Sequence, residues 1–186
     1  MKRLFDLSIS SMAIILLLVP MLIIIVAILL TSRGKILYWS DRVGLNNVIY
    51  KMPKFRTMLI DTPEVATHLL EKPEKYLTPI GSFLRNYSLD ELPQLISVLK
   101  GDMSIVGPRP ALFNQIDLIE FRKDKGLEEL MPGITGWAQV NGRDGLSIVD
   151  KVKLDEEYKN HQSLLFDLKI IWLTFLKIIR PEGVSH

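Results

Sequence analysis

Two adjacent carboxylates, Asp90 and Glu91, are the residues of this sequence best suited to chemistry. Adjacent carboxylates repel each other, so a divalent cation such as Mg²⁺ would stabilise the pair, and either carboxylate could attack phosphorus. Free amides at a helix start beside them would bind the phosphate. A structural explanation fits as well, because Ser88 and Glu91 have capping-box spacing and acids suit the first turn of a helix. The residue types alone leave both interpretations open.

A proline-flanked arginine offers a rigid cation for such a phosphate. Arg109 lies between Pro108 and Pro110, which hold its backbone extended. A guanidinium fixed in this way loses less entropy when it binds a phosphate. Residues 54–57 (Lys-Phe-Arg-Thr) add two cations, although long side chains at a membrane-facing strand end would explain them equally well.

A glycine-rich segment, residues 132–143, supplies further hydrogen-bond donors. Its three glycines allow close backbone approach, and its polar side chains suit an anion. The sequence has no GxxxxGK[ST] or GxGxxG nucleotide loop and no GxSxG nucleophile elbow. The three histidines are far apart and lack metal-ligand spacing. The standard nucleotide cradles are therefore missing, and the histidines are expected to be solvated surface residues.

The elements that must position these residues follow from local patterns. Residues 36–39 and 48–52 are predicted strands, and the turn residues 44–47 between them predict a hairpin. Proline directly after Thr62 and Thr78 predicts two helix starts.

Further along, polar helical patterns predict surface helices over residues 113–125 and 147–161. Residues 101–145 hold seven of the eleven glycines and three of the ten prolines and are predicted to be mainly loop. Residues 164–179 form an apolar helix with a narrow polar arc. This helix would lie either in a core or in a membrane interface, anchored by Trp172 and Phe175.

The N-terminal segment is long enough to cross a bilayer. Residues 9–30 are apolar, and a spanning helix needs roughly 20 such residues. Pro20 would kink or break this helix, and basic residues flank both of its ends. A spanning anchor and a re-entrant helix with both ends at one leaflet both remain open.

Length and composition limit the number of domains and the classes of function. The 186 residues suit one catalytic domain, and the net charge of +2 gives no support to a nucleic-acid binder. The sequence has no cysteine, which excludes disulfides and thiolate chemistry.

Five segments occur in one order along the chain: residues 54–58 (KFRTM), 88–95 (SLDELPQL), 100–104 (KGDMS), 107–110 (GPRP) and 132–143 (PGITGWAQVNGR). Each is weakly specific alone, but the ordered set resembles the bacterial sugar transferase family, the monotopic phosphoglycosyl transferases, over essentially the whole chain. The resemblance implies transfer of a sugar 1-phosphate from a UDP-sugar to undecaprenyl phosphate, with release of UMP. Asp90 would be the nucleophile and contact Mg²⁺ (or Mn²⁺), and Glu91 would be its partner, as base, ligand or orienting group.

The resemblance also ties several basic and polar residues to the site or to its supporting network. With the donors of the glycine-rich segment, the candidate substrate-binding residues are Lys54, Arg85, Arg109, Thr135, Gln139, Arg143 and Asp167. The expected partners are a UDP-sugar, undecaprenyl phosphate and membrane lipids. Which sugar is used and the oligomeric state are not predicted.

The implied fold is α+β and mostly helical, with a small β-hairpin and interfacial amphipathic helices. Residues 1–32 would form a re-entrant membrane helix broken at Pro20, where Val19 replaces the serine usual in the family. Residues 33–186 would form the catalytic domain at the cytoplasmic face of the bacterial inner membrane. Two other functions fit the same features: an inactive membrane scaffold of a glycan-assembly complex, and an anchored module that binds acidic lipids.

Overall fold

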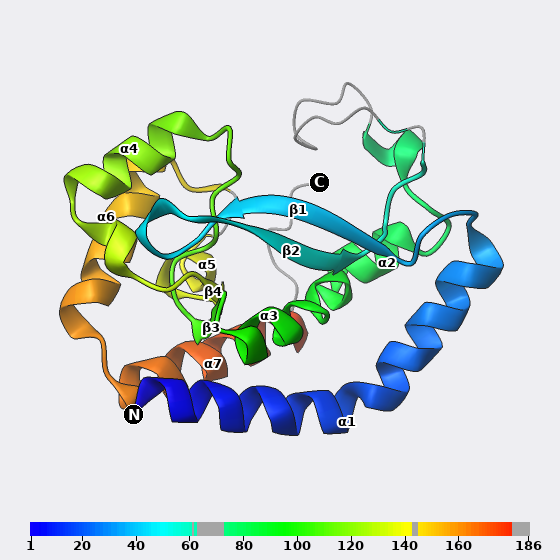
Figure 1. Ribbon diagram of the computed structural model, residues 1–186, viewed down its shortest axis with the longest axis horizontal. Coiled ribbons are helices and arrows are strands. Elements are labelled where there is room, and N and C mark those ends of the chain that lie inside the picture. Colours follow the sequence, from blue (N-terminus) through cyan, green and yellow to red (C-terminus); the bar gives the residue numbers. More distant parts are fainter. Residues whose placement is uncertain (61, 63–72, 143–144, 180–186) are drawn as a thin grey trace.

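The computed structural model describes residues 1–60, 62, 73–142 and 145–179. Its fold is α+β and mostly helical, as predicted, with two small sheets and a long N-terminal helix (Figure 1). The helices and strands are α1 (Lys2–Thr31), β1 (Leu37–Val43), β2 (Ile49–Phe55), α2 (Gly81–Asn86), α3 (Gln94–Lys100), β3 (Ser104–Val106), α4 (Ile116–Asp124), β4 (Gly133–Thr135), α5 (Trp137–Val140), α6 (Ile148–His161) and α7 (Leu164–Ile179).

Strands β1 and β2 form the predicted antiparallel hairpin. The turn between them contains Asn46 and Asn47 with positive φ angles of 52° and 61°, a conformation that asparagine tolerates well. Tyr38 is opposite Lys54, and Arg42 is opposite Tyr50. Because side chains alternate along a strand, Arg42 and Lys54 lie on the same face of the hairpin.

A second sheet lies within residues 101–145, which were predicted to be mainly loop. Strands β3 and β4 pair in parallel, with Ser104 opposite Gly133. A Cβ atom on Gly133 would lie 2.1 Å from the Gly107 nitrogen, and one on Gly136 would lie 2.0 Å from the Gly107 oxygen. These glycines therefore bring two backbones together, which is the close backbone approach that the sequence predicted.

The helix starts were predicted unevenly. Helix α6 begins as expected, with the Ser147 hydroxyl accepting a hydrogen bond from the Asp150 amide. Helix α4 lies within the predicted range 113–125. The prediction for Thr78 is wrong, because α2 begins at Gly81 and the Thr78 carbonyl accepts a turn hydrogen bond from the Gly81 amide. The helix start predicted after Thr62 lies outside the described residues.

Helix α1 remains one helix through Pro20, so the predicted break takes the form of a bend (Figure 1). Proline removes one backbone hydrogen bond and is the usual cause of such a bend. The bend lets both halves of α1 pack against the body of the protein. Asp6 accepts hydrogen bonds from the Ser104 hydroxyl and the Ile105 amide, and Ile28 in the second half is fully buried.

Both ends of α1 are also bound to the body. Lys2 Nζ lies 2.6 Å from Asp167 Oδ2 in α7. At the other end Arg56 donates to the Ser32 hydroxyl at 2.8 Å and to the Arg33 carbonyl. Arg56, which the sequence offered as a phosphate-binding cation, therefore holds the end of α1.

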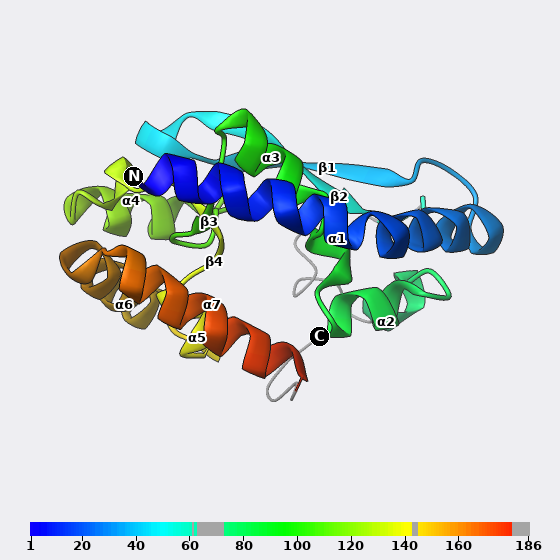
Figure 2. The ribbon, with the colours of Figure 1, turned by 90° about the horizontal axis from the view of Figure 1, so that it is seen from below.

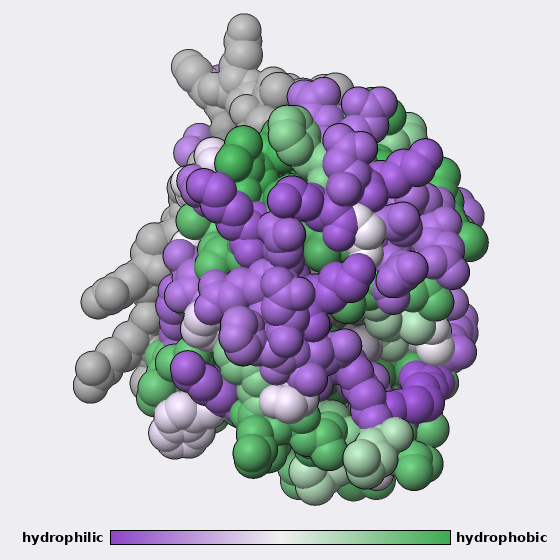
Figure 3. All heavy atoms as spheres, turned by 90° about the vertical axis from the view of Figure 1, so that its left-hand side faces the viewer, coloured by the Kyte–Doolittle hydropathy of each residue, from purple (hydrophilic) through white to green (hydrophobic). Residues whose placement is uncertain are grey.

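Helix α7 lies with its polar arc toward the body and its apolar side outward. Asp167 is 1% exposed, whereas Trp172 and Phe175 are 59% and 52% exposed. Of the two positions that the sequence left open for α7, the structure favours the interface. Helices α1 and α7 lie on the same face, which Figure 2 views from below. At the α4 and α6 end, polar residues cover most of the surface and apolar residues gather along the lower edge (Figure 3).

Candidate active site

Asp90 and Glu91 lie in a single 3₁₀ turn, Leu89–Glu91, which precedes α3. The predicted capping box is absent: Ser88 has a left-handed φ of 54° and its side chain caps no helix amide. The amides of Glu91 and Leu92 donate to the carbonyls of Ser88 and Leu89, so they are not free to bind phosphate as expected. The left-handed residue turns the chain so that both carboxylates point into the protein, where they are 7% and 8% exposed.

The two carboxylates have different surroundings although they are adjacent in sequence. Lys54 Nζ, from β2, lies 2.7 Å from Glu91 Oε1 and 3.8 Å from Asp90 Oδ2. Arg109 Nη2 lies 3.3 Å from the same oxygen of Glu91. Four predicted site residues are thus brought together from three separate segments, and the cations are concentrated on Glu91.

Asp90 keeps its lone pairs available. No described residue donates a hydrogen bond to its carboxylate, and its ionic contact is the longer one to Lys54. Burial raises the pKa of Asp90, Lys54 opposes that rise, and the neighbouring charge of Glu91 adds to it. A carboxylate that is buried without strong hydrogen bonds has a raised basicity, which suits a nucleophile.

Arg85 lies beside the same pair. Its Nε donates to the Thr57 hydroxyl at 2.9 Å, which fixes the guanidinium at the end of α2. Burial lowers the pKa of Arg85, and the charge of Asp90 counteracts this. Arg85 therefore remains a candidate for binding a substrate phosphate near Asp90.

Arg42 is a site residue that the sequence analysis did not identify. It counted there as a basic residue flanking the membrane segment, but it lies on the face of the hairpin that carries Lys54. Burial and the nearby Arg109 lower its pKa to about 10, while the charge of Glu91 raises it. The alternation of side chains along the predicted strands could have found it, because Arg42 and Lys54 have the same parity in the hairpin.

Two of the predicted substrate-binding residues have structural roles instead. The Thr135 hydroxyl lies 2.6 Å from the Thr174 hydroxyl, which itself donates to the Ile170 carbonyl, so Thr135 is the donor between them. Both oxygens of Asp167 are engaged, one by Lys2 and one by the Tyr158 hydroxyl. Thr135 therefore ties β4 to α7, and Asp167 ties α7 to α1.

The remaining two candidates are less well defined. The side-chain amide of Gln139 is buried, with no hydrogen-bond partner among the described residues, and packs near Gly136. Arg143 lies outside the described residues. Among the described residues, Gln139 has no hydrogen bond or ion pair with the carboxylate pair.

The donor set at the pair fits a hard divalent cation that is shared with the substrate. Among the described residues, no three acidic, histidine or cysteine side chains gather as a preformed metal cage. Mg²⁺ is commonly held by one or two carboxylates together with substrate phosphates. Asp90, whose oxygens accept no hydrogen bond from described residues, is the carboxylate that could take this part.

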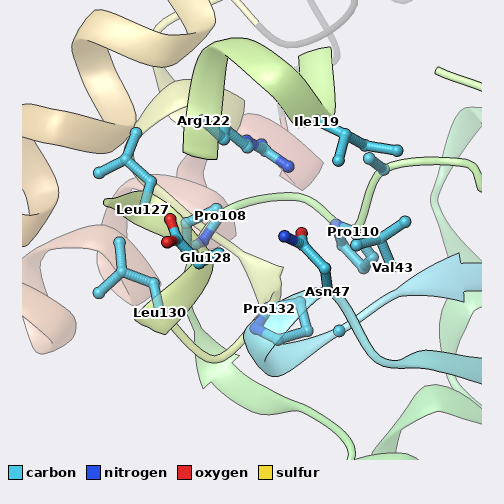
Figure 4. Close-up of a pocket in the computed structure, with 12 residues that line it drawn as sticks. Val43, Asn47, Pro108, Pro110, Ile119, Arg122, Leu127, Glu128, Leu130 and Pro132 are labelled. Atoms are coloured by element: carbon cyan, nitrogen blue, oxygen red, sulfur yellow. The ribbon is translucent and has the colours of Figure 1, made fainter. Parts of the chain in front are cut away.

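A small pocket of about 30 Å³ lies behind the loop that carries Arg109. Figure 4 shows Arg122 and Asn47 reaching toward it from different elements, with Pro108 and Pro110 along its wall. The described residues that line it include neither carboxylate, so this pocket is separate from the pair.

Comparisons with known proteins identify the family of this chain. The sequence model of the family described as bacterial sugar transferase matches residues 1–181. The chain is 40% identical to the uncharacterized sugar transferase EpsL of Bacillus subtilis, over 100% of this chain and 91% of that protein. It is 38% identical to the undecaprenyl-phosphate glucose phosphotransferase of Komagataeibacter xylinus, over 96% of this chain and 36% of that protein.

A third relative is the UDP-glucose:undecaprenyl-phosphate glucose-1-phosphate transferase of Escherichia coli, which is 37% identical over 95% of this chain and 40% of that protein. The chain thus spans less than half of these two longer enzymes and nearly all of EpsL. The family model covers α1 as well as the carboxylate pair and its cations. The chain belongs to the bacterial sugar transferase family and is a transferase enzyme.

Proposed function

We propose that this protein transfers a sugar 1-phosphate from a UDP-sugar to undecaprenyl phosphate and releases UMP. The observation that carries the proposal is the unequal environment of the two carboxylates. Glu91 is paired with Lys54 and Arg109, while Asp90 is buried and accepts no hydrogen bond from the described residues. The names of the two longer relatives supply the substrate classes.

The proposed reaction consists of two displacements at one phosphorus atom. First, an oxygen of Asp90 forms a bond to the sugar-bearing phosphorus of the UDP-sugar. The bond from this phosphorus to the bridging oxygen breaks, and UMP leaves with the electron pair. Then an oxygen of undecaprenyl phosphate attacks the same phosphorus and releases the Asp90 carboxylate, giving undecaprenyl diphosphate sugar.

The cations around the pair stabilise the charge that moves in these steps. Lys54 and Arg109 lie where they could bind phosphate oxygens as well as Glu91. Glu91 thereby acts as the orienting group for both cations. Mg²⁺ or Mn²⁺ bound at Asp90 and the diphosphate would compensate the negative charge of the leaving UMP.

We further propose that the protein is monotopic, with residues 33–186 as catalytic domain on the cytoplasmic face of the inner membrane. A 30-residue helix is about 45 Å long, which exceeds the hydrocarbon core of a bilayer. A spanning α1 would hold its two ends on opposite sides, yet Lys2 and Ser32 both contact the same body. The re-entrant alternative agrees with both contacts.

The test is to mix the purified protein in nanodiscs with each of several UDP-sugars and Mg²⁺, leaving out the lipid acceptor. One UMP per active site is expected, together with a phosphosugar adduct on the peptide that contains Asp90, detected by mass spectrometry. Adding undecaprenyl phosphate should remove the adduct and permit turnover. UMP release that needs the acceptor and leaves no adduct would indicate direct transfer, and the absence of UMP with every sugar would favour the scaffold.

A further inference from the structure

The loop that carries Arg109 is held by its carbonyl groups. Pro108 and Pro110 have no amide hydrogen to donate, so the loop has few backbone donors. Two of its carbonyls are bound by the backbone: Pro108 accepts from the Gly133 amide at 2.9 Å, and Ala111 accepts from the Val43 amide at 3.0 Å. The two carbonyls between them face side chains instead.

Two arginines from different elements bind these remaining carbonyls. Arg122 of α4 donates from Nη1 to the Arg109 carbonyl at 2.9 Å. Arg42 of β1 donates from Nη1 to the Pro110 carbonyl at 3.1 Å. Four successive carbonyls, from residue 108 to residue 111, therefore all accept hydrogen bonds.

Each of these arginines is itself fixed by a buried partner. Arg122 contacts Asp155 Oδ2 through Nε at 3.0 Å and Nη2 at 2.7 Å, and the side chain of Asp155 is 1% exposed. Arg42 donates from Nε to the hydroxyl of Ser40, a residue that is 4% exposed. Both guanidinium groups can therefore act as rigid anchors for the loop, because their planar forks are already oriented.

The position of these contacts fixes the direction of the Arg109 side chain. The peptide before Arg109 is held through the Pro108 carbonyl, and the peptide after it is held through its own carbonyl. Fixing both peptide planes fixes φ and ψ of Arg109, and with them the direction of its Cβ atom. Arg109 Nη2 then reaches Glu91 Oε1 at 3.3 Å.

We propose that Arg42 and Arg122 are positioning residues that clamp this loop and hold Arg109 in place for the sugar phosphate. The proposal rests on the proposed function, in which Arg109 binds a phosphate oxygen. The arrangement gathers three guanidinium groups around one loop, which is unfavourable by charge repulsion, and Glu91 and Asp155 offset this repulsion. Arg42 and Arg122 contact the loop backbone, so their effect on turnover passes through Arg109.

The test is a double-mutant cycle against Arg109→Ala. The first variant combines Arg122→Gln with Asp155→Asn, so that no buried charge is left unpaired. The second variant is Arg42→Gln, and each variant is measured with and without Arg109→Ala. Each is expected to lower kcat/KM for UMP release by about 10- to 100-fold in the otherwise native protein, the order of loss that a displaced positioning group causes. In the Arg109→Ala background the same changes should cost less than about threefold, since the group they position is gone. Lys123→Gln, an exposed neighbour on α4, is the matched control and should leave kcat/KM unchanged.

A second readout does not depend on turnover. Hydrogen–deuterium exchange at residues 109–112 should become faster in the clamp variants and stay unchanged in Lys123→Gln. Equal losses of kcat/KM in both backgrounds, or unchanged exchange in the loop, would overturn the clamp. If the native protein released no UMP with any sugar, the proposed function would fail while the exchange experiment still tested the clamp. If the Arg122 variant did not fold, the Arg42→Gln variant, whose change lies on β1, would test the clamp.

Discussion

Asp90 and Glu91 illustrate how neighbouring residues of one chemical type acquire different properties from their contacts. Lys54 and Arg109 both form ion pairs with Glu91 and compensate its charge. Asp90 has a longer contact to Lys54 and is buried, so its pKa is raised. A buried, poorly compensated carboxylate destabilises the folded state and is reactive toward an electrophile.

The first prediction at this scale concerns Asp90→Asn. The amide has the same shape but cannot form the phosphosugar bond, so turnover should fall to background. Because burial penalises the charged form of Asp90, the neutral amide should also raise Tm at neutral pH, by about 2–4 °C if the gain is about 1 kcal/mol. UMP release and calorimetry on the same sample check both parts. An unchanged rate would remove Asp90 from the role of nucleophile, and a lowered Tm would contradict the argument from burial.

The second prediction concerns pH. Only the ionised carboxylate is nucleophilic, so kcat/KM should decline on the acid side as Asp90 becomes protonated. Lys54 lowers the pKa of Asp90, so Lys54→Met should raise that pKa and move the acid limb to higher pH. The pH profile of UMP release measures this shift independently of the lower rate that the variant also has. If the acid limb of the kcat/KM profile stayed in place or moved to lower pH, a group other than Asp90 would control the decline in kcat/KM.

At the scale of elements, those that depend on local sequence signals were predicted well. Those that depend on contacts between distant segments were not. The hairpin and helix α6 were predicted because turn residues and a cap lie within a few positions of the residues they affect. The parallel pair β3–β4 was missed because its strands are short and about thirty residues apart. Ser88 has the spacing of a cap, yet tertiary packing places it in a left-handed turn.

The site was predicted to a similar extent. Ordered motifs led to Asp90, Glu91, Lys54 and Arg109, which the structure brings together. Whether a given polar residue faces the substrate or another helix depends on packing between distant segments, which a motif does not contain. For that reason Thr135 and Asp167 were expected at the substrate, whereas Thr135 connects β4 to α7 and Asp167 connects α7 to α1.

The third prediction concerns the bend in α1. Pro20→Leu restores a backbone hydrogen bond and should straighten the helix. A straight α1 could not keep Asp6 at β3 and Ile28 in its buried position together, so one half should detach. Loss of most UMP release and faster hydrogen exchange in one half of α1 are expected. Leu18→Ile, at an exposed position in the same helix, is the matched control and should leave both unchanged.

At the scale of the whole molecule, a polar body lies above an apolar base. The base consists of the outward sides of α1 and α7, where Leu16, Leu30 and Leu165 are 70%, 81% and 79% exposed. An apolar surface of this extent marks contact with a membrane in a protein of this kind. Since α1 touches the body along both halves, the base can enter one leaflet without separating the ends of the helix.

The fourth prediction tests this topology with single cysteines. The chain has no native cysteine, so Ser8→Cys, Lys35→Cys and Asp124→Cys can be labelled without background. All three positions are exposed, and the third lies on the body, for which we propose the cytoplasmic side. A membrane-impermeant thiol reagent should label none of them in intact cells and all of them after lysis. Labelling at position 8 but not at the other two would mean that α1 spans the membrane.

The contacts that hold α1 against the body join residues that the ribosome adds to the chain at very different times. Lys2 and Asp167 are 165 positions apart, and Asp6 and Ser104 are 98 positions apart. At a synthesis rate of about 5–20 residues per second, Lys2 waits roughly 8–33 s for Asp167 to be made. The partner of Asp6 is made 98 positions later, and until then the start of this apolar helix lacks that contact and exposes a surface that favours aggregation in water. In the proposed monotopic topology, insertion of α1 into the bilayer during synthesis would cover this apolar surface, so the lipid would protect the helix before it holds the site of the reaction.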